Sequence, residues 1–164
     1  MKIIKNFLNM KKDYIYIYNN LVKLNRHKKL YTNFVQEDTF SDRLLYFLLH
    51  FSFFLKNFKS NEDKKKIQDI YDYIFKQLEL SIREIGYGDQ SINKQMKNYL
   101  NLFHEIIIKV DNWENETIIT KKSILSSYLN KNADTPYLIE YFEKYRLKLI
   151  NNTLNSFIKG VVNH

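Results

Sequence analysis

The chain has 164 residues, which fits one domain with a sizeable buried core. It contains no cysteine, and this excludes disulfides, cysteine-ligated zinc, iron–sulfur clusters and a thiol nucleophile. The net charge of +8 is uneven, because residues 1–35 carry eight Lys and Arg against one acid, whereas the remainder carries 18 against 17. Such a local field attracts anionic lipid headgroups, RNA phosphates or an acidic partner.

The first segment, residues 1–30, is interpreted as a basic helical arm ahead of a domain that spans residues 31–164. From about Tyr14 to Phe34 the apolar spacing predicts a helix that carries most of the basic side chains. These side chains form either a solvated helix face or a contact with an anionic membrane surface or RNA; the residues concerned are Lys23, Arg26, Lys28 and Lys29. We expect no DNA partner. The opening MKIIKNFLNMKK lacks a cleavage site and a long apolar run, so we expect no secretory signal.

The segment from about Phe40 to Phe58 is apolar around most of a helical circumference. Its longest apolar run, Leu44–Leu55, is too short for a membrane span, which needs about 20 residues. It is therefore predicted to be a central helix surrounded by others. Good N-caps precede or begin it, namely Asp38, Thr39 and Ser41.

Three later segments each show one apolar stripe at helical spacing. The first runs from Lys64 through Ile74 to Ile85, the second from Ile92 to Val110, and the third from Leu138 to Leu149. Polar connectors separate these segments. Pro136 is suited to the first turn of the last long helix. Trp113, in one of the connectors, is interpreted as either an anchor or a lid on the core. No alternating strand pattern is convincing, so we predict an all-α domain of six or seven helices.

The stretch SIREIGYGDQSINKQMK, residues 81–97, contains two of the three glycines of the chain. Gly86 is suited to the left-handed conformation that ends a helix, and Gly88 lets the chain reverse. Asp89 or Ser91 is then expected to cap the next helix. A turn alone does not require the charges that gather here: Arg83, Glu84, Asp89, Lys94 and Lys97.

The usual catalytic constellations are missing from the sequence. The four histidines are scattered, and His104-Glu105 lacks the second histidine of a zinc-protease motif. GYGD follows a helix rather than a strand and lacks the end of a phosphate loop. We therefore expect neither an enzyme nor a metal or cofactor.

The turn and two further stretches resemble the ubiquinol–cytochrome c chaperone family. REIGYGDQSINKQMK is similar to the family's signature turn, which reads roughly Arg-Glu-x-Gly-x-Gly-Asp followed by Lys-x-x-Lys. DTFSDRLLYFLLH resembles a second family segment, and IYDYIFKQLELSIRE resembles the helix ahead of the turn. The three stretches stand in the family's order, over roughly residues 30 to 110.

This resemblance implies a non-catalytic assembly factor for the cytochrome bc1 complex that binds newly made cytochrome b. It implies partner-binding roles for Arg83, Glu84, Gly86, Gly88, Asp89, Lys94, Lys97, Arg43 and His50. It also implies a small helical co-chaperone, and a ribosome or membrane contact through residues 1–35. The location expected is the bacterial cytoplasm, peripheral to the inner membrane, with the mitochondrial matrix and inner membrane as the alternative.

Structural roles compete with several of these assignments. His50 stands on an almost wholly apolar helix, where a hydrogen-bonded core histidine is favoured over a client contact. Arg43 is expected to pair with an acid such as Asp38, Asp89 or Glu84. The functional prediction therefore depends on one arrangement: the charged turn must form an outward-facing patch beside an apolar, helix-lined recess.

Overall fold

The computed structural model describes residues 1–31, 39–129 and 133–160. Within these ranges the chain forms α-helices joined by short turns and no strands, which confirms the all-α prediction. The elements are α1 (Lys2–Asn25), η1 (Lys28–Leu30), α2 (Phe40–Phe58), α3 (Lys64–Glu84), α4 (Asp89–Val110), η2 (Trp113–Asn115), α5 (Ile118–Tyr128), α6 (Thr135–Ile150) and α7 (Leu154–Ile158).

Most helices begin at a side-chain cap that the local sequence supplies. Thr39 accepts a hydrogen bond from the Asp42 amide at the start of α2, and Asp63 accepts one from the Lys66 amide at the start of α3. The same arrangement starts the three later helices α5, α6 and α7, at Thr117, Asp134 and Thr153. Pro136 lies in the first turn of α6, as expected.

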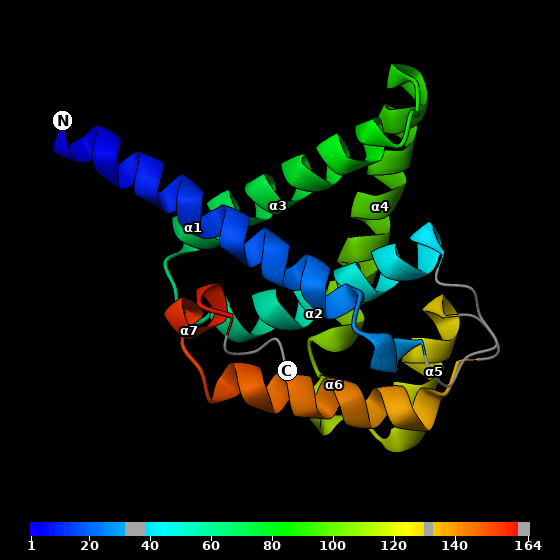
Figure 1. Ribbon diagram of the computed structural model, residues 1–164. Helices are drawn as coiled ribbons and strands as arrows, with labels where there is room; N and C mark the ends of the chain where they lie inside the picture. Colours follow the sequence, from blue (N-terminus) through cyan, green and yellow to red (C-terminus); the bar gives the residue numbers. More distant parts are fainter. Residues whose placement is uncertain (32–38, 130–132, 161–164) are drawn as a thin grey trace.

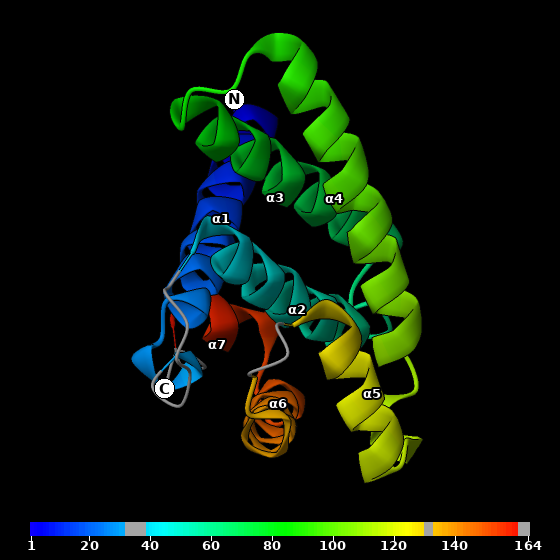
Figure 2. The same ribbon diagram turned by 90° about the vertical axis from the view of Figure 1, so that its right-hand side faces the viewer.

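Helix α2 is the centre of the molecule. Every residue from 46 to 55 is buried, so the helix is enclosed on all sides, as its apolar circumference predicts. Figure 2 shows it near the middle of the bundle, with α1, α3, α4 and α6 around it. Its one internal serine, Ser52, donates to the Leu49 carbonyl at 2.7 Å and needs no partner outside the helix.

Four phenylalanines of α2 each contact an aromatic ring from a different neighbouring helix. Four ring pairs, with their centroid separations, are Phe47 with Tyr18 of α1 at 5.7 Å, Phe51 with Phe103 of α4 at 5.1 Å, Phe53 with Phe142 of α6 at 5.3 Å, and Phe54 with Phe157 of α7 at 4.8 Å. These separations are typical of favourable aromatic pairs. One helix therefore links four others through its phenylalanines.

Helix α1 differs from the sequence prediction in its bounds. It begins at Lys2 and ends at Asn25 instead of spanning residues 14–34, and residues 32–34 lie outside the described part of the chain. Its first turns extend beyond the bundle (Figure 1). From Tyr14 onward, however, one face of α1 packs into the core, where Ile17, Leu21 and Leu24 are at most 4% exposed.

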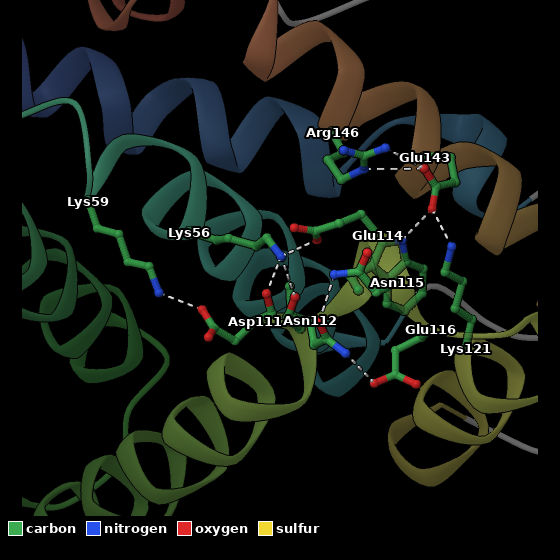
Figure 3. Close-up of polar contacts among 12 residues, drawn as sticks. Lys56, Lys59, Asp111, Asn112, Glu114, Asn115, Glu116, Lys121, Glu143 and Arg146 are labelled. Atoms are coloured by element: carbon green, nitrogen blue, oxygen red, sulfur yellow. Dashed lines mark hydrogen bonds and ion pairs between the residues drawn. The ribbon is translucent and has the colours of Figure 1, made fainter.

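The connector after α4 is held by a polar network (Figure 3). Lys56 of α2 donates to the backbone carbonyl of Val110 and pairs with Glu114. Trp113 is fully buried and donates its indole N–H to Glu143 of α6 at 2.8 Å, so it is a core residue rather than a surface anchor.

Glu143 is the acid at the centre of this network. Partial burial alone would raise its pKa, but hydrogen bonds and charge from Lys121 and Arg146 outweigh burial and hold the pKa of Glu143 below its ordinary value. Glu143 therefore joins η2, α5 and α6 to one another.

Candidate partner-binding site

The turn between α3 and α4 lies at the tip of a helical hairpin that rises away from α5 and α6 (Figure 1). Gly86 has a φ of +101°, which confirms the left-handed conformation expected after α3, and its amide donates to the Arg83 carbonyl at 3.0 Å. Gly88 has an ordinary φ of −69° and is the N-cap of α4. The expected cap from Asp89 or Ser91 is wrong, because α4 begins without a side-chain cap.

The carboxylate of Asp89 instead forms an ion pair with Arg83. Arg83 also donates from Nε and Nη2 to Glu79 Oε1, at 3.1 and 2.9 Å. The hydrogen bonds to Glu79 and Asp89 raise the pKa of Arg83, and the bond to Glu79 has the larger effect. In turn, the hydrogen bond from Arg83 is the main reason that the pKa of Glu79 is lowered. Arg83 therefore links the end of α3 to the start of α4 across the turn.

A recess of about 420 Å³ opens beside the turn, between α1, α2 and α3. Its lining is mainly apolar and includes Val22, Leu44, Phe47, Leu78 and Ile85. Three charged residues also line it: Arg26, which caps the end of α1, Arg43 from α2 and Glu84 from α3. Residues that are widely spaced in the sequence thus form one apolar hollow with charged groups around it.

The floor of the recess contains fixed polar groups. The hydroxyls of Tyr18 and Ser81 are hydrogen-bonded at 2.7 Å, which joins α1 to α3. Asn25 is buried, and within the described part of the chain its Oδ1 has no hydrogen-bond partner. A buried acceptor without a partner costs free energy, because its desolvation is not compensated.

The rim of the recess exposes large apolar side chains. Ile85 is 56% exposed and Phe40 is 37% exposed, and both line the recess; Tyr87, in the turn itself, is 42% exposed. Sequence periodicity places Ile85 on the buried stripe of α3, and that assignment is wrong because α3 ends one residue earlier. The sequence signal for the exposure of Ile85 is its position directly before the glycine that ends the helix.

The structure divides the predicted site residues into two groups. Arg43 and Glu84 line the recess, together with Arg26, which the sequence assigns to a different contact. Lys94 and Lys97 are exposed on α4 and do not line it. Successive helix residues are rotated by about 100°, so these lysines lie about 200° and 140° around α4 from the buried Ile92.

His50 is a core residue, as the competing interpretation predicts. It is fully buried, with Nδ1 hydrogen-bonded to the Tyr46 carbonyl at 2.6 Å and Nε2 to the Tyr141 hydroxyl at 2.8 Å. Burial lowers the pKa of His50 to about 4. A partner reaches neither ring nitrogen in this arrangement, so His50 is corrected from a contact residue to a packing residue.

The four predicted basic contact residues all lie where α1 ends. Lys23, Arg26, Lys28 and Lys29 are exposed, the last two in η1. His27 accepts a weak hydrogen bond from the Lys29 amide, which shapes this segment. Because Arg26 also lines the recess, the basic cluster and the recess are adjacent.

Two further kinds of site are absent from the described residues. No three His, Asp or Glu side chains there gather closely enough to hold a metal ion. No helix in those ranges combines the length and apolar character that crossing a membrane requires.

Comparison with known proteins identifies the family. A family described as "Ubiquinol-cytochrome C chaperone" matches residues 32–135, which contain α2, α3, the glycine turn and α4. The chain belongs to this family. Arg43, Glu84 and the turn lie inside the matched region, whereas α1 lies before it.

One solved structure also resembles the fold. It is described as the crystal structure of the Cbp3 homolog from Brucella abortus, at 22% identity and a TM-score of 0.74, and the match covers 97% of this chain and 92% of that one. No curated protein matches the chain. This likeness to the Brucella abortus structure shows that the two chains share a fold.

Substitution of the two turn glycines is expected to separate their roles. Gly86→Ala should lower the free energy of unfolding by about 1–2 kcal/mol, because its positive φ is strained for any residue with a Cβ although no neighbour obstructs that atom. Gly88→Ala is the matched control and should change it by less than about 0.5 kcal/mol. Urea unfolding of both variants checks this, and equal losses would contradict the assigned conformations.

The buried His50 is expected to make stability fall in mild acid. It stays neutral in the folded protein down to about pH 4, whereas an unfolded histidine binds a proton below about pH 6.5. The unfolded state therefore binds more protons in this window, and the free energy of unfolding falls with pH by up to about 3 kcal/mol. Denaturant unfolding across this range should show a shallower slope for His50→Gln; an unchanged slope would refute the assignment.

Proposed function

We propose that this protein is a non-catalytic assembly chaperone for the ubiquinol–cytochrome c reductase (bc1) complex, and that its client is newly made cytochrome b. The observation that carries the proposal is the family match over residues 32–135, which includes two walls of the recess and the turn. The client is taken to bind at the recess, with the exposed rim residues as first contacts. Neither a cofactor nor a catalytic step is part of this role.

The chemistry of the recess suits an apolar client that must later be released. A membrane-protein segment outside the bilayer gains free energy by covering its apolar surface, at about 25 cal/mol per Å². Ile85 and Phe40 offer apolar surface that no other part of the described chain covers. Arg26, Arg43 and Glu84 supply charged groups around it that fix the orientation of the client more than they add affinity.

The exposed lysines of α4 have a separate place in this proposal. Lys94 and Lys97 lie outside the recess lining, so they act on the approach or orientation of the client and not on its apolar contact. A small helical co-chaperone is a further proposed partner.

A second function is favoured by the basic cluster at the end of α1. Four exposed cations in a short segment attract an anionic membrane surface, RNA or the ribosome, and the contribution of each weakens with salt. Because this cluster borders the recess, it would hold the recess close to where a membrane protein is made. The proposed location is the cytoplasmic side of a bacterial inner membrane, or the matrix side of the mitochondrial one.

A charge placed on the rim of the recess is expected to weaken client capture. Tagged Ile85→Asp should recover about tenfold less cytochrome b than the unchanged protein, because the substitution buries a carboxylate against apolar client surface. Ile119→Asp is the matched control, since Ile119 is 82% exposed on α5 and does not line the recess. Immunoblotting of the recovered cytochrome b measures both.

Three outcomes of this experiment decide the proposal. Loss in Ile85→Asp alone supports it. Equal loss in both variants, or full recovery with Ile85→Asp, overturns the recess as the client site. Absence of cytochrome b from the unchanged protein overturns the client assignment itself.

A further inference from the structure

The outward face of α1 carries a straight row of exposed polar and basic side chains. Its members are spaced three or four residues apart, which places them on one side of a helix. This α1 row consists of Lys12, Tyr16, Asn19, Lys23 and Arg26, the last of which is the C-cap of α1. At a rise of about 1.5 Å per residue the row is roughly 21 Å long. Core residues such as Leu21 lie on the opposite side of the helix.

The cations of the α1 row have no acidic partners of their own. Within the described part of the chain no ion pair joins Lys12, Lys23 or Arg26 to an acid. Asp13 is the one acid in the sequence between residues 12 and 31, and it lies about 100° around the helix from Lys12. A row of like charges without internal partners attracts an anionic surface from outside the molecule.

The recess opens along one flank of this row. Asn19 and Arg26 belong both to the α1 row and to the lining of the recess. The rim of the recess exposes Phe40 and Ile85, by 37% and 56%. Cations and exposed apolar side chains therefore lie next to one another. A surface that binds at the boundary between lipid headgroups and acyl chains needs both kinds of group.

The other flank of the row has a different charge. A groove between α1, α3 and α7 shares no lining residue with the recess, and its Asp13 lies about 180° around α1 from Val22 of the recess lining. Four aspartates line this groove, and two of its three lysines already pair with glutamates, Lys66 at 2.9 Å and Lys76 at 3.5 Å. An anionic surface is repelled from this flank, so its approach is tilted toward the recess.

We propose that α1 lies along an anionic phospholipid surface through this row, tilted so that the mouth of the recess faces the headgroups. The cations pair with lipid phosphates, and Tyr16, which is 53% exposed, lies among the headgroups. Phe40 and Ile85 reach the boundary of the acyl chains. Lipid binding needs no client; that the recess then meets cytochrome b at the membrane rests on the proposed function.

The apolar neighbours of the row favour lipid over RNA. Single-stranded RNA is bound by several aromatic rings on which its bases stack, and Tyr16 is the one aromatic residue of the α1 row. RNA would also leave Phe40 and Ile85 in water, whereas a bilayer covers them. A lipid surface therefore suits both the cations and the apolar rim.

Sedimentation of the full chain with vesicles tests this surface. Vesicles of phosphatidylcholine with about one third phosphatidylglycerol should bind at least about tenfold more tightly than phosphatidylcholine alone, and added salt should reduce the difference. Lys12→Gln with Lys23→Gln should weaken binding to the anionic vesicles by about tenfold or more. Lys122→Gln with Lys148→Gln removes the same charge from exposed positions of α5 and α6, and should leave the affinity within about twofold.

Single-site labels test the orientation, because the chain has no cysteine of its own. An environment-sensitive fluorophore attached to Tyr16→Cys or to Phe40→Cys should emit at shorter wavelength when the anionic vesicles are added. The same fluorophore on Asn155→Cys, an exposed position of the groove on the other flank, should not shift. Equal shifts at positions 40 and 155 would overturn the tilt toward the recess.

Three further outcomes overturn the proposal. Equal affinity for the two kinds of vesicle would show that the row does not select anionic lipid. Equal losses in the two double variants would assign the binding to net charge. An RNA duplex that displaces the chain from the vesicles, and that Lys12→Gln with Lys23→Gln no longer binds, would assign the row to RNA. None of these measurements contains cytochrome b, so failure of lipid binding is distinguished from failure of client capture.

Discussion

The structure depends on the packing of one apolar helix against the helices around it. Phe47, Phe51, Phe53 and Phe54 of α2 each contact a ring from a different helix, so the positions of α1, α4, α6 and α7 are set by one element. Aromatic side chains bury large areas, and their interdigitation resists shifts because interiors are close-packed. His50 belongs to the same core, since its hydrogen bonds to Tyr46 and Tyr141 satisfy a polar ring where water is excluded.

This packing explains where the molecule is open. The first turn of α2 carries Phe40 and Arg43 at the surface, and there α1 and the end of α3 diverge enough to leave the recess. The α3–α4 turn stands beside it, closed by the pairing of Arg83 with Glu79 and Asp89. A rigid core therefore presents a small apolar hollow with charged residues, which is what a binding protein needs to select an orientation and still release its client.

Helical periodicity predicts both ends of α2, and the ends of α3 to within one residue. It does so because an apolar pattern on one side or all sides of a helix is a local property of the chain. Gly86 is equally predictable, since only glycine adopts a positive φ without strain. The end of α1 and the burial of Trp113 were not predictable in this way. Each depends on contacts between distant segments, such as Trp113 with Glu143, and a single sequence carries no record of them. For the same reason the sequence indicates the charges of the turn but not that Arg26 joins Arg43 and Glu84.

We propose that the recess at the first turn of α2 contacts the client directly. A photo-crosslinking amino acid placed at Phe40 tests this while cytochrome b is being synthesised, with the same group at Ile118 of α5 as reference, since Ile118 is 73% exposed and does not line the recess. A covalent adduct with cytochrome b is expected from position 40 and none from position 118. Adducts of equal yield from both positions, or from position 118 alone, would contradict it.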